Sequence, residues 1–497
     1  MPLKKAGSLW LVTYFELTGF QLTHQSYIGT RDKIELGDES SINQTYGPKY
    51  APQKDTVFSH IAFMLKYDDF NLDLLLAIFC RVEEQEVTNY ILGNPNGRYS
   101  RRIGYLYEWL TGKKLKMAIS VGGNYIDLLD PERYITGKII KNTRWRINDN
   151  LLGVSEFCPV VRKTQSLKEL ITKDIRKEIE NLKRDYLPEI FQRASQYLYR
   201  KETRSSYEIE SEKPSPDRME RFINILYHAG KQPFLDIISE KSLTALQNEI
   251  VDARYAQPAF RDFQNYIGQT NYRGEEIYHY VCPPKDMVGS LMKGLAAIEK
   301  KTEGTSELVR AAIIAFGFVF IHPFLDGNGR IHRFLIHDML TRDGLAEEGL
   351  IIPVSAHMLQ YKSEYDRALE SYSKPLMKRV QCSILENGDL NIDNPDDVGP
   401  YFRYPDLTVQ SEYLAKTIFS TIHEDLFDEL YFLQRYDEFK MELQQLIDMP
   451  DKRLSSVIIY LHQNKGIFPN RRKNQFEEIT EEEFASMEKI YKEIFNR

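Results

Sequence analysis

The sequence predicts a mainly α-helical protein, and three observations support this prediction. Apolar residues recur at helical spacing through most of the chain beyond residue 165. Near the centre, residues 306–320 and 330–341 form two such patterns with a short loop between them. Strand-like patterns are few and short, and residues 265–284 have the pattern of a β-hairpin. We therefore expect a helical core with one small hairpin and helical regions on either side.

The two central helices are predicted from their apolar residues and from their ends. Residues 306–320 are an almost uninterrupted apolar run, and a helix that is apolar on most sides is normally buried. Residues 330–341 continue the helical pattern, and Gly344 stands where a glycine commonly ends a helix. The sequence HPFLDGNG between them is therefore predicted to be a tight loop whose last residues open the second helix.

This loop has the residues of an anion-binding site. Gly327 and Gly329 allow backbone conformations that other residues avoid and let a ligand approach the main chain. Successive loop N–H groups and a helix N-terminus give a concave region of positive potential that suits phosphate. Arg330 and Arg333 are three positions apart and project from the same side of the first helical turn. The loop is therefore predicted to bind phosphate groups.

Two further residues of the loop add chemistry. Asp326 offers a hard oxygen ligand, which suits Mg²⁺ bound to phosphates. His322, at the other end of the loop, is placed to take a proton from an incoming hydroxyl. The sequence Gly-Asn-Gly alone would favour a simple turn between helices. The complete set of residues in such a short stretch instead favours a functional loop.

Residues 322–333 resemble the Fic family signature, HPFxxGNGRxxR, at every fixed position. The resemblance implies a Fic-type helical core and a protein adenylyltransferase that uses ATP and Mg²⁺. His322 would be the general base that deprotonates a Ser, Thr or Tyr hydroxyl of a target protein. Asp326 would hold Mg²⁺ against the α- and β-phosphates. The hydroxyl would attack the α-phosphorus, pyrophosphate would leave, and AMP would stay on the target.

The same resemblance implies how the nucleotide is held. Asn328, together with the N–H groups of Gly327 and Gly329, would orient the α-phosphate. Arg330 and Arg333 would hold the β- and γ-phosphates. The chemistry would then consist mainly of positioning and charge neutralisation.

A second stretch, residues 203–212 (TRSSYEIESE), resembles the inhibitory motif of Fic proteins, [S/T]xxxE[G/N]. Ser206 and Glu210 have the required spacing and lie on one face of a predicted helix at about residues 195–212. The resemblance implies that Glu210 pairs with Arg333 and withdraws it from the γ-phosphate, since such pairs are strong when shielded from water. Ser211 departs from the pattern, in which glycine or asparagine follows the glutamate.

The hairpin predicted at residues 265–284 has a turn at Arg273-Gly274 and ends at Pro283-Pro284. In Fic proteins a hairpin in this position, the flap, binds the target segment by strand addition. By this resemblance four flap residues would lie over the nucleotide and the modified side chain: Ile277, Tyr278, His279 and Tyr280. An exposed hairpin with a purely structural role is the alternative.

Tyr365 lies in a stretch, YKSEYDRALESY, that resembles the helix after the Fic signature. Members of the family line the adenine pocket with an aromatic residue there, which implies a nucleotide contact for Tyr365. Many members carry two consecutive tyrosines, whereas Asp366 is the second residue here. A buried packing tyrosine is the alternative.

The chain is expected to contain three regions. Residues 1–150 would be an N-terminal accessory domain, mostly helical with short strands, in which the polar residues 29–51 form a long loop. Residues 151–400 would be the Fic catalytic domain. Residues 401–497 would be a C-terminal α-helical extension packed on the core.

Composition and charge are ordinary, with 42% hydrophobic residues, 28% charged residues and a net charge of −7. They give no reason to expect nucleic acid or membrane as a partner. Four cysteines lie far apart without the spacing of a zinc site, which fits a reducing cytosol. We expect a cytoplasmic protein whose partners are target proteins bound along the flap. Self-modification is expected, and a homodimer is left open.

Four functions remain compatible with the sequence. The first is a self-inhibited adenylyltransferase. In the second, Glu210 positions water and the same site removes AMP from a modified protein. In the third, the site transfers UMP or a phosphate instead, although Gly329 and Asp326 favour transfer of a nucleotide. The fourth is a binding module with a vestigial site, against which the complete motif with both arginines argues.

Overall fold

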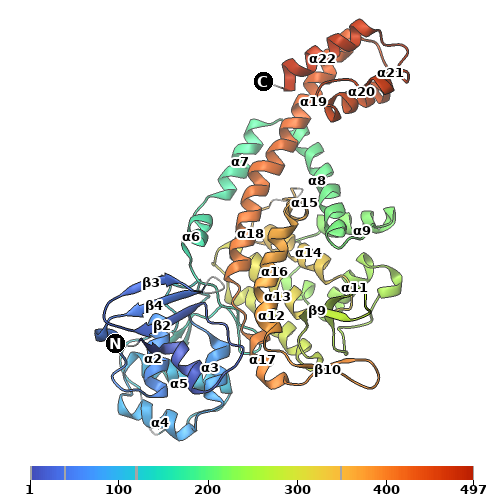
Figure 1. Cartoon of the computed structure of the whole chain (residues 1–497). Helices are drawn as coiled ribbons and strands as arrows, with labels where there is room; N and C mark the ends of the chain where they lie inside the picture. Colours follow the sequence, from blue (N-terminus) through green and yellow to red (C-terminus); the bar gives the residue numbers. More distant parts are fainter. Residues whose placement is uncertain (1–2, 38–40, 118–120, 347–349, 496–497) are drawn as a thin grey trace.

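The computed structural model describes residues 3–37, 41–117, 121–346 and 350–495 of the chain. Figure 1 shows an N-terminal unit beside a larger central unit, and a C-terminal unit carried on a long helix. Each of the three units has its own hydrophobic core. The architecture is mainly α-helical, as the sequence predicts.

The N-terminal unit combines helices with two small sheets. The first sheet has the strand order β1-β2-β4-β3, in which β2 and β4 are parallel and the other pairs antiparallel. The second has the order β5-β7-β6. The strands are β1 Lys4–Ala6, β2 His24–Ile28, β3 Lys33–Leu36, β4 Ile42–Tyr46, β5 Ile126–Asp127, β6 Ile140–Asn142 and β7 Ile147–Asp149. The helices are α1 Gly7–Tyr14, α2 Val57–Tyr67, α3 Leu72–Phe79, α4 Glu84–Gly93, α5 Arg98–Thr111 and the 3-10 turn η2 Pro48–Tyr50.

Residues 29–51 are not the long loop that the sequence predicts, because they contain β3 and β4. All residues of β3, whose sequence is KIEL, are exposed. Main-chain pairing with β4 therefore holds this strand, and little apolar burial contributes to it. Such a strand leaves almost no hydrophobic pattern in the sequence, which explains why the prediction failed.

The central unit is built around α13 (Glu307–Ile321) and α14 (Asn328–Arg342), which pack along each other. α13 also contacts α12 and α18, so it is covered on every side, and this explains its apolar sequence. The other helices are α6 Gln165–Ile171, α7 Ile175–Asp185, α8 Pro188–Ile209, α9 Pro216–Tyr227, α10 Phe234–Ile237, α11 Glu240–Ile250, α12 Val288–Lys301, α15 Val354–Gln360, α16 Lys362–Met377, α17 Pro395–Arg403 and α18 Thr408–Ser420. The remaining elements are η3 Ala253–Tyr255, β8 Tyr266–Thr270, β9 Glu276–Val281, η4 Lys285–Met287, β10 Cys382–Ile384 and β11 Leu390–Ile392.

The C-terminal unit stands away from the central unit on a long helix (Figure 1). α18 continues through a π-helical turn into α19, which packs against α8 and places Leu430 in the central core. Further along the same helix, Phe439 and Leu443 belong to a separate core. The extension therefore packs its apolar residues on the central core only as far as Leu433, because its last helices bury their apolar faces against one another. These elements are η5 Thr421–Leu426, α19 Phe427–Leu446, α20 Asp451–Gln463, α21 Asn470–Lys473 and α22 Glu481–Phe495.

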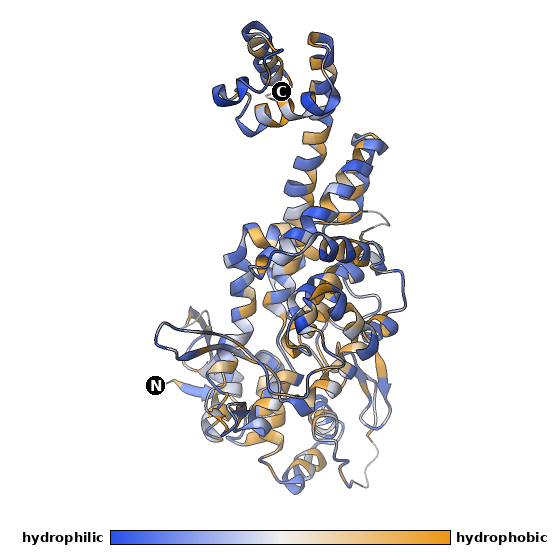
Figure 2. Cartoon of the chain, turned by 90° about the vertical axis from the view of Figure 1, so that its right-hand side faces the viewer, coloured by the Kyte–Doolittle hydropathy of each residue, from blue (hydrophilic) through white to orange (hydrophobic). Residues whose placement is uncertain are grey.

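The long helix carries both apolar and hydrophilic residues along its length, as the hydropathy colouring in Figure 2 shows. This mixture suits a helix that packs on neighbours along one side and meets water on the other. Within the described ranges, no helix is long and apolar enough to cross a membrane.

Candidate active site

The loop between α13 and α14 turns tightly because two residues adopt left-handed backbone conformations. His322, with φ 54°, ends α13, and its N–H donates to the carbonyl of Phe318 at 3.0 Å. Gly327, with φ 89°, begins α14. A Cβ atom at Gly327 would lie only 2.8 Å from Cγ1 of Val251, so this position requires glycine for two reasons.

His322 is held as a neutral base. Its ring Nδ1 lies 3.0 Å from the carbonyl oxygen of Val319. A carbonyl can only accept a hydrogen bond, so the neutral ring carries its proton on Nδ1 and leaves the lone pair on Nε2. Burial lowers the pKa of His322 to about 4, and the positive charge of Arg261 acts in the same direction. At neutral pH the Nε2 atom is therefore free to accept a proton.

Arg330 and Arg333 are buried at the start of α14, and each is only 1% exposed. Glu210, at the end of α8, bridges the two guanidinium groups. Its Oε1 lies 2.7 Å from Nη2 of Arg333, and its Oε2 lies 2.8 Å from Nε of Arg330. Arg333 also donates from Nε to the hydroxyl of Ser206 and from Nη2 to its carbonyl, both at 2.7 Å. The contact between Glu210 and Arg333 that the sequence predicts is present, and Arg330 joins it.

Three carboxylates surround Arg330. Besides Glu210, Glu212 lies 2.6 Å from its Nη1 and Asp326 lies 2.6 Å from its Nη2. Burial opposes the charge of Arg330, but Glu210, Asp326 and Glu212 outweigh it and raise its pKa above the ordinary value. Glu212 also pairs with Arg218 of α9 at 2.6 Å. The end of α8 is thus bound to the start of α14 by more than one carboxylate.

The end of α8 shows why glycine or asparagine is expected at the position of Ser211. Ser211 has φ 58°, the left-handed conformation that favours glycine or asparagine after a helix. Its N–H donates to the carbonyl of Glu208, and the N–H of Glu212 donates to the carbonyl of Tyr207. These two bonds form a Schellman motif, which turns the chain so that Glu210 and Glu212 both reach the arginines.

Gly329 and Asn328 have distinct roles in the loop. A Cβ atom at Gly329 would lie 2.2 Å from Oε1 of Glu210, so the carboxylate lies directly against the main chain there. The side chain of Asn328 donates from Nδ2 to the carbonyl of Phe324 at 2.8 Å and accepts from its N–H at 3.0 Å. Asn328 therefore closes the loop, while the lack of a side chain at Gly329 leaves room for the carboxylate of Glu210.

Residues 237–340, which include this loop and both of its arginines, match the model of the Fic/DOC family. The chain contains a Fic/DOC domain. A Fic family protein from Desulfovibrio desulfuricans is 19% identical, with a TM-score of 0.37, over 54% of this chain and 75% of that chain. A Fic domain containing signaling protein from Bacteroides thetaiotaomicron is 18% identical, with a TM-score of 0.34, over 52% of this chain and 96% of that chain. The comparison with curated proteins gave no match.

Fic/DOC domain proteins transfer nucleotide-derived groups onto proteins, so this domain is that of a transferase. The matched residues run from the end of α10 through the flap into α14. They include His322 and the arginines, whereas Ser206 and Glu210 on α8 lie outside them. The helix that contacts the arginines is therefore an addition to the matched part of the domain.

The flap of the Fic/DOC domain is the antiparallel pair β8 and β9, with an irregularity between Ile267 and Gly268. β8 is exposed along its whole length and is an edge strand. On β9, Ile277 and His279 are exposed and Tyr278 is partly buried. Tyr280 is 5% exposed, and its hydroxyl donates to the carbonyl of Phe320. The side chain of Tyr280 thus belongs to the core, and the nucleotide contact expected for it is not supported, because β9 enters the core at this residue.

Tyr365 on α16 also lies in the core. It is 4% exposed, and its ring lies 6.2 Å from that of His332 and 6.0 Å from that of Tyr413. Burial raises the pKa of its hydroxyl, while the nearby Arg333 opposes the rise. The structure gives Tyr365 the packing position that the sequence left as the alternative to an adenine contact.

Asp326 is the residue of the Fic/DOC loop that fits a magnesium ion. Its Oδ1 accepts from the N–H of Gly327 and from Arg330, both at 2.6 Å. Its side chain remains 36% exposed, so a carboxylate oxygen is open to the solvent side of the loop. Mg²⁺ commonly takes one or two carboxylates together with phosphates and water. A single exposed carboxylate beside an anion site matches this requirement.

Sequence reasoning missed Glu212, Arg218 and Arg261. Glu212 lies within the quoted inhibitory stretch, but it has no place in the motif. Arg218 and Arg261 are isolated arginines without a motif, and each is buried, at 9% and 3% exposed. Only the folded chain brings these residues to the loop.

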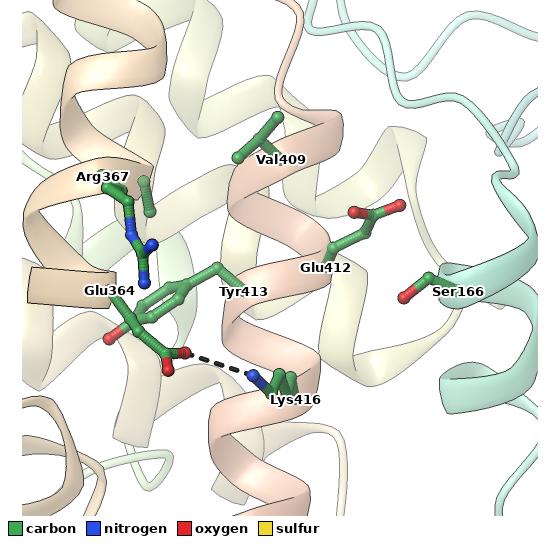
Figure 3. A pocket seen from close by; sticks show the side chains of 8 residues that line it. Ser166, Glu364, Arg367, Val409, Glu412, Tyr413 and Lys416 are labelled. Carbon is green, nitrogen blue, oxygen red and sulfur yellow. Dashed lines mark hydrogen bonds and ion pairs between the residues drawn. The ribbon is translucent and has the colours of Figure 1, made fainter. Parts of the chain in front are cut away.

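A shallow cavity of about 240 Å³ lies between α6, α16 and α18 and contains none of the predicted site residues (Figure 3). Glu364 and Lys416 form an ion pair at 3.2 Å across it, and Tyr413 lies at its base. Tyr413 packs against Tyr365.

Proposed function

We propose that this chain is a self-inhibited protein adenylyltransferase. It transfers AMP from ATP to a Ser, Thr or Tyr hydroxyl of a target protein, and to its own hydroxyl groups. The observation that carries the proposal is the position of Glu210, whose carboxylate lies against Gly329 between Arg330 and Arg333. A carboxylate in this place makes the ion pairs and the main-chain contact that a phosphate group of a nucleotide would make.

In the proposed reaction the target lies along the exposed edge of β8 and presents its hydroxyl to His322. The Nε2 atom takes the hydroxyl proton as the oxygen forms a bond to the α-phosphorus. The bond between the α-phosphorus and the bridging oxygen of pyrophosphate breaks at the same centre. Arg330 and Arg333, once released from Glu210, hold the β- and γ-phosphates. Mg²⁺, held by Asp326, would supply further positive charge to the phosphates.

Removal of AMP is the second candidate, since Glu210 is 27% exposed and can meet water at the mouth of the site. The test is the intact mass of wild-type and Glu210→Gly proteins after incubation with each nucleoside triphosphate and Mg²⁺. An AMP adduct in the variant supports adenylylation, and a UMP adduct identifies another nucleotide. Loss of AMP from a pre-adenylylated protein, without any adduct, would replace transfer by removal.

Replacing Asp326 by alanine in the Glu210→Gly protein is expected to abolish adduct formation with Mg²⁺. The variant loses the exposed carboxylate beside the proposed phosphate site, and Arg330 loses one of the two carboxylate partners, Glu212 and Asp326, that remain without Glu210. Intact mass measured across a series of Mg²⁺ concentrations gives the result. Full activity at low Mg²⁺ would show that Asp326 does not bind the metal.

The rate of auto-modification by the Glu210→Gly protein is expected to stay constant on acidification from pH 8 to about pH 5. An ordinary histidine has a pKa of 6.5, but burial lowers the pKa of His322 to about 4. Protonation of Nε2 blocks the base, so activity is present above this pKa and is lost as pH falls through it. Initial rates at each pH, with circular dichroism as a control for folding, test this. A loss of rate centred near pH 6.5 would contradict it.

A further inference from the structure

The main-chain carbonyl groups around His322 accept hydrogen bonds from residues at the base of the flap. Residues 320–324 present five successive carbonyl groups, which extend from the end of α13 into the loop. Each accepts a hydrogen bond from a residue in the segment before β8 or at the end of β9. The donors are Tyr280 Oη to Phe320, Arg261 Nη2 to Ile321 at 3.5 Å, Arg261 Nε to His322 at 2.8 Å, Arg261 N to Pro323 at 2.8 Å and Asn265 Nδ2 to Phe324 at 3.1 Å.

Arg261 makes three of these five bonds and also holds the flap itself. Its Nη1 donates to the carbonyl of Phe263 at 2.9 Å, just before β8. Its Nη2 donates to the carbonyl of Pro283 at 2.7 Å, just after β9. One side chain therefore joins both ends of the hairpin to the main chain of His322.

The location of Arg261 suits a buried cation. The carbonyls of Ile321 and His322 are at the C-terminus of α13, the negative end of the helix dipole, where a positive charge is favoured. Within the described ranges, every hydrogen-bond partner of Arg261 is a carbonyl group. Burial lowers the pKa of the guanidinium. A lysine could supply the charge, but it lacks the planar set of donors that reaches several carbonyls at once.

We propose that Arg261 is a positioning residue that fixes His322 relative to the flap, so that a hydroxyl bound on the flap meets the base. This inference rests on the proposed transferase function. The flap would position the target hydroxyl, and α13 positions His322. Transfer of the hydroxyl proton requires these two positions to match closely. A misplacement of about 1 Å can lower a rate on the order of 100-fold.

Replacing Arg261 by lysine in the Glu210→Gly protein is expected to lower the auto-modification rate at saturating ATP by roughly 100-fold. The ATP concentration at half-maximal rate is expected to stay within about twofold, because Arg330 and Arg333 are untouched. Arg254→Lys is the matched control, since Arg254 lies seven positions earlier and pairs at the surface with Asp252. An unchanged rate, or a fall caused by weaker ATP affinity alone, would overturn the proposal.

Asn265→Asp provides a second variant if Arg261→Lys does not fold. Aspartate keeps the oxygen that accepts from the N–H of Tyr266 but loses the donor to Phe324. A tenfold or greater loss of rate with unchanged half-saturation supports the link between flap and loop. An auto-modification rate equal to that of the Glu210→Gly protein would contradict this link.

Amide hydrogen exchange separates this inference from the proposed function, because it needs no activity. In the Arg261→Lys protein, exchange is expected to accelerate at least tenfold both at residues 281–282 of the flap and at residue 324 of the loop. Acceleration in neither segment, or in only one, would exclude a link through Arg261. If the Glu210→Gly protein forms no adduct with any nucleotide, the proposed function fails, and the exchange result still decides the role of Arg261.

Discussion

Replacing Glu210 by glycine is expected to raise the auto-modification rate with ATP and Mg²⁺ on the order of 100-fold. In the wild-type chain this carboxylate holds Arg333 at 2.7 Å and Arg330 at 2.8 Å and lies against Gly329. A hydrogen bond to a charged group contributes about 1.5–3 kcal/mol. The release of each arginine is therefore expected to change the auto-modification rate roughly tenfold to hundredfold. The initial rate of AMP adduct formation, followed by intact mass, measures the effect.

Two variants define what the increase means. Glu208→Gly is the matched control, because Glu208 is exposed in the last turn of α8 and its replacement loosens the same helix end. It is expected to keep the wild-type rate. Glu212→Gln is expected to give a smaller increase than Glu210→Gly, because Arg330 keeps its pairs with Glu210 and Asp326 and Arg333 stays paired with Glu210. Equal rates for wild-type and Glu210→Gly proteins would exclude Glu210 as an inhibitor.

Replacing His322 by alanine in the Glu210→Gly protein is expected to lower the transfer rate by about 100-fold to 10,000-fold. The variant loses Nε2, which is the free acceptor of a ring whose Nδ1 is bonded to Val319. ATP affinity is expected to remain unchanged, because the proposed phosphate ligands are Arg330 and Arg333 at the start of α14. Single-turnover rates and ATP binding by calorimetry together test this.

His228→Ala is the matched control for His322→Ala, because His228 is exposed at the end of α9. It is expected to change neither the rate nor ATP binding. Retained transfer in the His322→Ala protein would exclude His322 as the base. A parallel loss of ATP binding would instead show that the residue supports the loop as a whole.

The sequence predicts most reliably those features that depend on neighbouring residues. The loop from His322 to Arg333 can be recognised because its glycines, arginines and flanking apolar helices are close together in the chain. The same holds for α8, whose Ser206 and Glu210 are one helical turn apart. The hairpin of β8 and β9 was predicted from a turn between short strands, and it lies where the sequence places it.

Other features depend on which residue of an element meets the core. The family resemblance implies nucleotide contacts for Tyr280 and Tyr365, with a structural hairpin and a packing tyrosine as the alternatives, and both side chains are buried against aromatic rings. The direction of a side chain at the end of a strand or at the start of a helix is set by what packs against it. The sequence pattern alone therefore does not predict whether such a side chain points into the core.

The sequence by itself determined the helical class, the loop with His322 and its two arginines, and the carboxylate expected to face them. Each follows from spacing within one or two turns of chain. The tertiary structure decided that Arg330 is enclosed by Glu210, Glu212 and Asp326, and that Arg261 joins the flap to His322. These contacts join segments far apart in the chain. They form because a buried charged group or carbonyl is stable only with a hydrogen-bond partner. The fold decides which partners lie near each group.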